Sequence, residues 1–265
     1  MNILVCVKQV PDTTEIKINP ETNTLIREGV PSIVNTFDGY ALELAARIKD
    51  KQDAKIIVMS MGPEQAKNAL KECLSVGADK AYLVSDRAFG GSDTLATGYI
   101  LSMAVKAVEA EEGPFDIIFC GKQAIDGDTA QTGPQLAEHL NYPQITCITE
   151  ISVENGKIRA ERETEYGKEI WEAEAPVVVT ATKPAFDPRY PTMKSKMAAN
   201  RATIPVLTIN EVKADPEKSG LKGSPTKVKR TYVPPRKSGG VIIQEETAQE
   251  SVGKLTELLS AAMLV

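Results

Sequence analysis

The chain has 265 residues, of which 42% are hydrophobic and 25% charged, and its formal net charge is −5. This composition is that of a globular protein large enough for one sizeable core, and the acidic balance argues against a nucleic-acid-binding surface. No apolar run approaches the about 20 residues that a membrane span needs. The start, MNILVCVKQV, also lacks the cationic lead and cleavage site of a signal peptide, so we expect a cytoplasmic protein.

The cysteines and the histidine offer little material for a metal or catalytic site. Cys6, Cys73, Cys120 and Cys147 lie in or beside apolar stretches and form no CxxC pair, so we expect reduced thiols that act as small hydrophobes. His139 is the only histidine and is expected to face solvent or to cap a helix. We therefore predict no zinc site and no Ser–His–Asp arrangement, which disfavours a hydrolase or lyase.

Short apolar runs alternate with amphipathic segments in the first part of the chain. The runs span residues 3–7, 56–61, 81–84 and 116–120 and are almost continuously hydrophobic, which is typical of strands buried on both faces. Helical patterns cover residues 38–50, 63–79 and 92–110, the last with Ser92 or Asp93 as its cap. This alternation predicts right-handed βαβ units and a Rossmann-like α/β fold with a parallel sheet.

The pattern changes after about residue 145. Two turn signals, ENGK and EYGK, predict an antiparallel extension on the main sheet or beside it, and residues 177–182 again read as a buried strand. The stretch 213–240 is rich in Pro, Gly, Ser and Lys and is expected to be disordered or laid on another chain. The end of the chain predicts an amphipathic helix with Thr247 as its cap, whose apolar face needs a surface to cover it. This face consists of Val252, Leu255, Leu258 and Leu259.

The stretch GKQAIDGDTAQTGP, residues 121–134, stands at the carboxyl end of a predicted strand, where parallel sheets bind their ligands. It is neither a dinucleotide GxGxxG motif nor a Walker loop. Gly121 and Gly127 allow close approach of backbone. A helix is expected to begin between Thr129 and Gly133, so that its free N–H groups form an anion site.

Polar side chains in the same stretch divide into donors and acceptors. Thr129, Gln131 and Thr132 supply donors, whereas Asp126 and Asp128 suit ribose hydroxyls or the loop's own amides. A plain turn with a helix cap is the alternative interpretation of this stretch.

Three further turns lie at or after strand ends: residues 34–38, 59–63 and 90–97. Asn35 and Asp38 can bond a base or sugar, and capping of the first helix would explain them equally well. Because the carboxyl ends of parallel strands meet at one edge of a sheet, we expect all four turns to converge there. A binding site at this edge accounts for their small and hydroxyl residues together.

Five motifs now point to a known family. VCVKQVPDT, VNTFDGYALELA, SMGP, GKQAIDGDTAQTGP and VVVTAT…DPRYPTMKSKM follow one another in this order, and together they resemble the β subunit of the electron-transfer flavoproteins. The resemblance covers about residues 1–205, and the tail loosely. It implies a Rossmann-like domain that binds an adenine nucleotide, and a heterodimer with an α subunit that carries FAD. In some members the nucleotide is AMP; in the electron-bifurcating members it is a second FAD that takes electrons from NADH.

The resemblance, together with the helix start in GGSDTLATGY, gives the residues expected to hold this nucleotide. None of them is expected to be catalytic. They are Cys6, Val7, Lys8, Asn35, Asp38, Ser60, Met61, Gly62, Asp93, Thr94, Thr97, Gly121, Lys122, Gln123, Ala124, Gly127, Asp128, Thr129, Ala130, Gln131 and Thr132.

The segment RYPTMKSKMAANR matches the family's recognition loop, which docks an acyl-CoA dehydrogenase. Met193, Lys194 and Lys196 are the expected docking residues. Met193 departs from the anchoring leucine of the AMP-containing members, although Leu and Met are similar in volume and apolarity. We expect residues 1–205 to form the nucleotide-binding domain, with its docking loop at 188–201, and residues 206–265 to form an extended arm that packs on the partner subunit.

VKQVPDT and SDTLAT resemble the bifurcating members more than the others. We therefore predict FAD as the cofactor, NADH as the electron donor, and an acyl-CoA dehydrogenase and a low-potential ferredoxin or flavodoxin as acceptors. Such a chain is an electron carrier, and an NADH-oxidising flavoprotein only as the heterodimer. The alternatives are a carrier with structural AMP, and a stand-alone adenine-nucleotide-binding module of the ATP-hydrolysing stress-protein kind.

Overall fold

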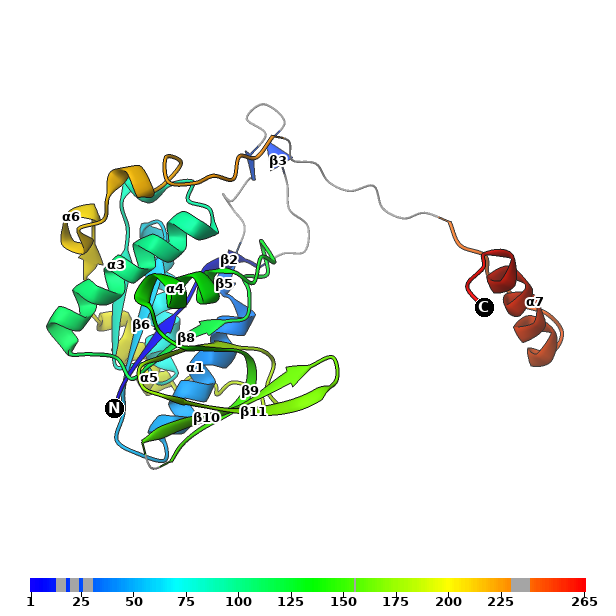
Figure 1. The fold of residues 1–265 in the computed structure, drawn as a ribbon, viewed down its shortest axis with the longest axis horizontal. Coiled ribbons are helices and arrows are strands. Elements are labelled where there is room, and N and C mark those ends of the chain that lie inside the picture. Colours follow the sequence, from blue (N-terminus) through cyan, green and yellow to red (C-terminus); the bar gives the residue numbers. More distant parts are fainter. Residues whose placement is uncertain (13–17, 20–23, 26–30, 155, 230–238) are drawn as a thin grey trace. The chain divides into compact units, whose positions relative to one another are not determined.

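Buried apolar strands form the centre of the protein, as described by a computed structural model (Figure 1). The described residues are 1–12, 18–19, 24–25, 31–154, 156–229 and 239–265. They divide into two units that we treat separately. The first comprises Met1–Lys17 and Leu25–Lys229, and the second comprises Ile18–Thr24 and Arg230–Val265.

A nine-stranded sheet organises the first unit. Its order is β11-β10-β9-β12-β8-β1-β6-β7-β13, and every neighbouring pair from β9 to β13 is parallel. The predicted α/β fold with a Rossmann-like parallel sheet is thereby confirmed. The parallel strands are β1 (Asn2–Cys6), β6 (Lys55–Met61), β7 (Lys80–Val84), β8 (Ile117–Gly121), β9 (Gln144–Glu154), β12 (Val177–Ala181) and β13 (Val206–Leu207).

Helices cover both faces of this sheet (Figure 1). One face packs against α1 and α2, and α5 lies on α2. The other face packs against α3 and α4, which also contact each other. Each of these helices turns its apolar side toward the sheet, and the strands are therefore buried on both faces. Their bounds are α1 (Thr36–Lys49), α2 (Lys67–Ser75), α3 (Thr94–Glu112), α4 (Thr132–Leu140) and α5 (Met193–Arg201).

The antiparallel extension belongs to the main sheet itself. Strands β10 (Lys157–Thr164) and β11 (Gly167–Glu174) add to β9 through two antiparallel pairings. Ile158 and Ala160 on β10 are buried in the same core as α1, which explains why the extension stays on the sheet. Of the two predicted turns, EYGK joins β10 to β11, whereas Asn155 of ENGK lies outside the described residues.

Residues 206–229 belong to the first unit, whereas the sequence placed the boundary at residue 205. Strand β13 pairs with β7, and α6 (Ile209–Val212) contacts α3. The polar stretch that follows is fixed by hydrogen bonds that composition cannot show: Ser224 Oγ accepts from the Asp93 N–H at 2.8 Å, and Ser92 Oγ accepts from the Gly220 N–H at 3.1 Å. The part predicted to be disordered or laid on another chain is thus anchored on its own domain as far as Lys229. Residues 230–238 lie outside the described part.

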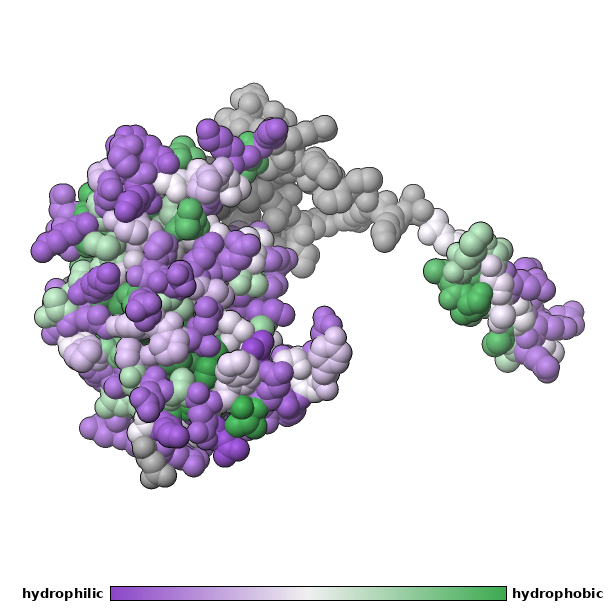
Figure 2. All heavy atoms as spheres, viewed as in Figure 1, coloured by the Kyte–Doolittle hydropathy of each residue, from purple (hydrophilic) through white to green (hydrophobic). Residues whose placement is uncertain are grey.

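The second unit contains α7 (Ala248–Ala261). Its predicted cap is confirmed: Thr247 Oγ1 accepts from the Glu250 N–H at 3.2 Å, and Glu250 Oε2 accepts from the Thr247 N–H at 3.1 Å, which completes a capping box. The helix itself has a hydrophobic side and a hydrophilic side (Figure 2). Its amphipathic character is therefore as the sequence predicted.

Four short strands form two further ladders. Strands β2 (Gln9–Pro11) and β5 (Ser32–Val34) pair antiparallel, and β3 (Ile18–Asn19) pairs with β4 (Thr24–Leu25). Within the described ranges, none of the helices combines the length and the apolar character that crossing a bilayer requires.

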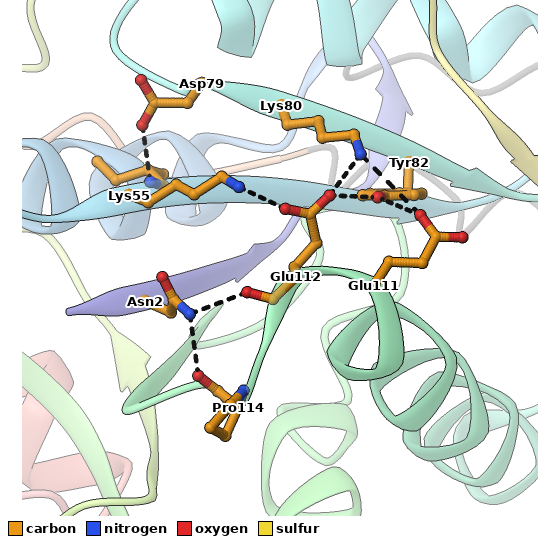
Figure 3. A network of polar contacts seen from close by, with 9 residues as sticks. Asn2, Lys55, Asp79, Lys80, Tyr82, Glu111, Glu112 and Pro114 are labelled. Carbon is orange, nitrogen blue, oxygen red and sulfur yellow. Dashed lines mark hydrogen bonds and ion pairs between the residues drawn. The ribbon is translucent and has the colours of Figure 1, made fainter.

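A polar cluster closes the amino-terminal end of the strands (Figure 3). Glu112, at the end of α3, is 6% exposed and forms ion pairs with Lys55 and Lys80. The hydroxyl of Tyr82, whose ring is fully buried, donates to Glu112 Oε1 at 2.7 Å. Asn2 Nδ2 donates to the Glu112 carbonyl at 3.1 Å. The cluster ties α3 to β1, β6 and β7 at the edge opposite the predicted binding site.

Candidate nucleotide-binding site

The predicted site residues gather at the carboxyl edge of three neighbouring strands. Cys6 ends β1, Met61 ends β6 and Gly121 ends β8, and the sheet order places β1 between β6 and β8. The turn 34–38 was expected after a parallel strand, but it follows β5 of the antiparallel ladder with β2. It reaches this edge through the contacts of Asn35 and Asp38 with the loop after β8. Because a parallel sheet binds ligands in the crevice outside the carboxyl ends of its strands, the convergence expected from the sequence is present in the fold.

Asn35 holds the loop that follows β8. Its Nδ2 donates to the Gln123 carbonyl at 2.8 Å, and its Oδ1 accepts from the Ile125 N–H at 3.0 Å. Asn35 occupies the N-cap position of α1, but its side chain makes no capping hydrogen bond. The capping alternative is therefore wrong for this residue: its amide fixes the loop that was predicted to hold the nucleotide.

Asp38 ties the ends of β1 and β8 to the first turn of α1. Its Oδ2 accepts from the Lys8 N–H at 2.7 Å and its Oδ1 from the Gly121 N–H at 3.1 Å. Burial raises the pKa of Asp38 to about 7, and the two backbone N–H groups act in the opposite direction. Both oxygens of Asp38 are thus bonded to backbone N–H groups just after the ends of β1 and β8.

The two acidic side chains of the loop are paired inside the site. Asp126 forms an ion pair with the Lys8 ammonium at 2.6 Å, and Asp128 Oδ1 accepts from Gln123 Nε2 at 2.7 Å. The chain turns back on itself here, since the Ala124 carbonyl accepts from the N–H groups of both Gly127 and Asp128. Asp128 thus holds an amide of the loop itself, as one of the two expected roles required, whereas the sequence did not predict the pairing of Asp126 with Lys8.

The start of α4 has the donors that an anion requires. The helix begins at Thr132, and Gln131 at its N-cap makes no side-chain capping bond, so the first N–H groups keep their capacity for a ligand. Thr129 and Gln131 are exposed beside them. Ala130 has φ of 52°, a left-handed conformation that costs a non-glycine residue about 1 kcal/mol. Strain of this kind concentrates at ligand sites.

The donor set fits an adenine nucleotide. The α4 N-terminus with Thr129 and Thr132 suits a phosphate. A further hydroxyl, Ser60 Oγ at the end of β6, is buried and has no hydrogen-bond partner among the described residues, so it can accept one from a bound group or water. Met61 and Gly62 continue this edge, and the Gly62 N–H donates to the Val84 carbonyl at 3.0 Å.

The start of α3 is more occupied than the sequence suggested. Asp93 caps the helix by accepting from the Ala96 N–H at 3.0 Å, and its other oxygen accepts from the Thr226 N–H at 3.1 Å. Burial acts to raise the pKa of Asp93, but these N–H groups hold it below its ordinary value. Thr94 Oγ1 donates to Gln131 Oε1 at 3.1 Å. Both carboxylate oxygens of Asp93 are thus engaged by backbone N–H groups, and Thr94 contacts the loop after β8.

The backbone N–H groups of two further candidates, Val7 and Lys122, are bonded to neighbouring strands. Val7 is buried and its N–H donates to the Met59 carbonyl at 2.8 Å, while the Lys122 N–H donates to the Ala181 carbonyl at 2.7 Å. Sequence reasoning missed Ser224 and Thr226, because they lie in a stretch whose composition indicated a linker. Both residues lie far from Asp93 in the sequence, so no local pattern could have indicated their contact with it.

The docking residues lie on a different part of the domain. Met193 is 76% exposed, and Lys194 and Lys196 are exposed on the same helix, α5. Thr192 caps α5 with Ser195 in a capping box. The segment is thus a short ordered helix that presents a methionine to solvent.

The thiols and the histidine behave as their surroundings dictate. Cys6, Cys73 and Cys120 are buried and Cys147 is partly buried, all as free thiols. Burial raises the pKa of Cys73 well above its usual range, so this thiol is unreactive. His139 is exposed at the end of α4, as expected, and packs edge-to-face on Tyr99 at 5.9 Å. In the described part of the chain, no group of three His, Cys, Asp or Glu side chains is arranged to hold a metal.

The fold defines a class: a Rossmann-like α/β domain in which a polar loop and a helix start lie at the carboxyl ends of a parallel sheet. The model of the electron transfer flavoprotein domain matches residues 22–212. The chain belongs to the electron transfer flavoprotein family. The relatives described next show that it is a β subunit. The family consists of flavoproteins.

Relatives align over the whole chain. The electron transfer flavoprotein subunit beta of Megasphaera elsdenii is 52% identical over 270 residues, and that of Thermoanaerobacterium thermosaccharolyticum is 49% identical over 266 residues. The caffeyl-CoA reductase-Etf complex subunit CarD of Acetobacterium woodii is 46% identical over 266 residues. Each alignment covers 100% of this chain and 100% of the relative.

Proposed function

We propose that this chain is the β subunit of a heterodimeric electron transfer flavoprotein of the bifurcating type. It binds FAD at the carboxyl edge of the sheet, receives electrons from NADH, and passes them to an acyl-CoA dehydrogenase and to a low-potential ferredoxin or flavodoxin. The relative named as a subunit of a caffeyl-CoA reductase-Etf complex supports a partner that acts on a CoA thioester.

The observation that carries the proposal is the preformed loop from Gly121 to Thr132. Asn35, Asp38 and Lys8 hold it through side-chain contacts, and it leads into a helix start whose N–H groups are not capped by a side chain. Because these contacts already hold the loop in place, a nucleotide that binds to it has little loop ordering entropy to offset. When bound, the flavin supplies the redox chemistry. The protein's own residues bind and orient the nucleotide, and no side chain of this chain needs to react.

FAD and AMP share the adenosine monophosphate half, so the loop alone serves either nucleotide. FAD needs a place for a second phosphate and for the flavin. The first turn of α3 supports FAD, because Thr94 lies within hydrogen-bonding distance of Gln131 in the loop. Thr94 and Thr97 are therefore the residues we assign to the second phosphate.

The α subunit is proposed as the partner of α7. An isolated amphipathic helix of 14 residues is marginal in water, so its apolar side requires a surface. The α subunit supplies one, since the relatives are themselves designated β subunits.

The test is to co-express the chain with its α subunit, denature the purified heterodimer, and identify the released nucleotides. We expect two FAD per heterodimer and bleaching of the flavin absorbance on addition of NADH. One FAD and one AMP per heterodimer, with no response to NADH, would assign the chain to the AMP-containing carriers. ATP hydrolysis by the isolated chain, without flavin in any complex, would support the stand-alone nucleotide-binding module instead.

A further inference from the structure

Arg189 joins the docking segment, residues 188–201, to helix α1. Its Nε donates to Glu43 Oε2 at 2.8 Å, and its Nη2 donates to Asp50 Oδ2 at 2.7 Å. The backbone N–H of Arg189 also donates to Glu43 Oε2, at 3.1 Å. Side chain and main chain of one residue are therefore both fixed on α1, four positions before Met193.

The Glu43 side chain is only 4% exposed, so its carboxylate depends on hydrogen bonds from the protein and not from water. Arg47 shares the carboxylate through a 2.9 Å contact with Oε1. Burial acts to raise the pKa of Glu43, but the hydrogen bonds from Arg189 and Arg47 outweigh it and hold the pKa below its ordinary value. If the segment left α1, the buried Glu43 carboxylate would lose the Arg189 side-chain and backbone hydrogen bonds and keep only the contact with Arg47, which is unfavourable for a buried charge.

Two further contacts hold the same segment. The Arg47 guanidinium lies 3.4 Å from the centre of the Phe186 ring, just before Arg189. At the other end, α5 packs on α2, and Ala199 is buried there. Between these anchors the apolar side chains point to solvent: Tyr190 is 91% exposed, Met193 76% and Met197 54%. The segment is a rigid backbone that presents apolar side chains.

Helix α1 is also the helix that holds the nucleotide loop. Asn35 and Asp38 at its start contact the loop after β8, and Glu43 and Asp50 at and beyond its later turns hold Arg189. The turns between are buried in the sheet's core. One rigid element therefore carries the loop at one end and the docking segment at the other.

We infer that Arg189 is a positioning residue for docking: it locks the docking segment on α1, so that Met193 and its exposed apolar neighbours are held ready in one arrangement for a dehydrogenase. A preformed docking surface loses less ordering entropy on binding, so the lock raises the affinity for the dehydrogenase. The inference rests on the docking role proposed for Met193. Its physical basis is the double carboxylate contact, which a guanidinium fork satisfies and a single ammonium does not.

The test uses the purified heterodimer with a short-chain acyl-CoA dehydrogenase as the electron-transfer probe. Arg189→Lys keeps the charge but cannot bridge Glu43 and Asp50. Asp50→Asn removes only the exposed half of the contact, since Asp50 is 57% exposed. Arg159→Lys, at an exposed position on β10, is the matched control. Flavin content, thermal stability and the NADH-dependent reduction rate are measured alongside electron transfer at increasing dehydrogenase concentration.

We expect Arg189→Lys to raise the dehydrogenase concentration for half-maximal transfer by about tenfold or more, which corresponds to about 1.4 kcal/mol, and Asp50→Asn to raise it by less. Flavin content and NADH-dependent reduction stay within about twofold of the parent, and Arg159→Lys changes nothing. Loss of flavin in parallel with loss of transfer would show a general role in folding and overturn the inference.

Met193→Ala separates failure of the inference from failure of the docking role. If Met193→Ala weakens transfer and Arg189→Lys does not, the clamp only stabilises the fold and the inference is wrong, while the docking proposal stands. If neither substitution changes the half-saturating concentration, both the docking surface and the clamp are wrong.

Discussion

The carboxylate of Asp38 accepts a hydrogen bond from the backbone N–H of Gly121 at 3.1 Å, and the contact leaves no room for a side chain at residue 121. A Cβ there would lie 2.2 Å from Asp38 Oδ1 and 2.8 Å from the Asp38 nitrogen. The end of β8 and the start of α1 thus approach so closely that only glycine fits. The nucleotide loop begins at this point.

Gly121→Ala should therefore displace the nucleotide loop. The added methyl group meets backbone and a buried carboxylate, neither of which can move without breaking the bond to Lys8. We expect a loss of about 2 kcal/mol or more of unfolding free energy and heterodimer purified with little nucleotide from this subunit. Denaturant unfolding and nucleotide release measure the two effects.

Gly127→Ala is the matched control within the same loop. No atom lies within 4 Å of a Cβ at residue 127, so the folded protein accommodates the methyl group. The stability of the nucleotide-free chain should change by less than about 0.5 kcal/mol. Equal destabilisation by the two alanines would contradict the close contact at Gly121.

Asn35→Asp tests whether the amide of Asn35 is needed as a donor and an acceptor together. The aspartate still accepts from the Ile125 N–H, but it cannot donate to the Gln123 carbonyl, and it places a second carboxylate beside Asp38. We expect a nucleotide affinity at least about tenfold weaker, with a stability loss of about 1–3 kcal/mol. Titration of the refolded, nucleotide-free heterodimer with FAD measures the affinity. Unchanged affinity would mean that the loop keeps its shape without this bridge.

The sequence predicted the strands and the edge of the site because both have local signals. The near-continuous apolar runs of β1, β6 and β8 indicate strands buried on both faces, and a glycine-rich turn after such a strand indicates a ligand-binding edge. The role of Asn35 could not be predicted in this way. An asparagine before a helix suits a cap and a distant loop equally, and only the fold brings Gln123 and Ile125 beside it.

The boundary at residue 205 shows a second limit. Gly, Pro, Ser and Lys are the residues of linkers, and they are also the residues of a polar segment fixed by hydrogen bonds. Residues 216–226 are of the second kind, because Ser92, Asp93 and Ser224 bind their backbone. Arg189 is a similar case, since nothing near it in the sequence indicates Glu43 or Asp50.

Glu112 predicts how stability depends on pH at the opposite edge of the sheet. Its contacts with Lys55, Lys80 and Tyr82 lower its pKa to about 2, below its unfolded value of 4.5. The folded state then binds fewer protons than the unfolded state between these values, so the contribution is full above pH 4.5 and is lost as pH falls towards 2. Allowing for water around the two lysines, it amounts to about 1–2 kcal/mol.

Glu112→Gln should remove this contribution. Unfolding in urea at pH 7 should show a stability loss of about 1–2 kcal/mol, and the difference from the parent chain should shrink as pH falls below 4.5. Glu138→Gln is the control, because Glu138 is exposed on α4 and has no ion-pair partner among the described residues. A loss of the same size at every pH would exclude a charge effect as its origin.

Met193→Ala should weaken docking and leave the cofactor in place. Met193 is 76% exposed on a helix start that is fixed by its capping box, so truncating it changes the surface without disturbing the core. We expect a rise of about fivefold or more in the dehydrogenase concentration for half-maximal transfer, since a central apolar anchor contributes about 1 kcal/mol or more. Met263→Ala, an exposed methionine in the other unit, serves as the control for methionine loss alone.

Removing residues 235–265 should separate the chain from its α subunit while the sheet domain stays folded. The domain keeps β13, α6 and the anchored stretch to Lys229, because these belong to the first unit. The deleted part contains α7, whose apolar side needs a covering surface. Co-purification with a tagged α subunit should fall below detection, while the circular dichroism spectrum of the truncated chain retains its α/β shape.

Leu255→Asp within the full chain should reproduce the loss, because it puts a charge on the apolar side of α7. Glu257→Gln on the opposite side should not. If the truncated chain binds the α subunit as tightly as the full chain, the heterodimer is held by other surfaces of the sheet domain and the arm has another role.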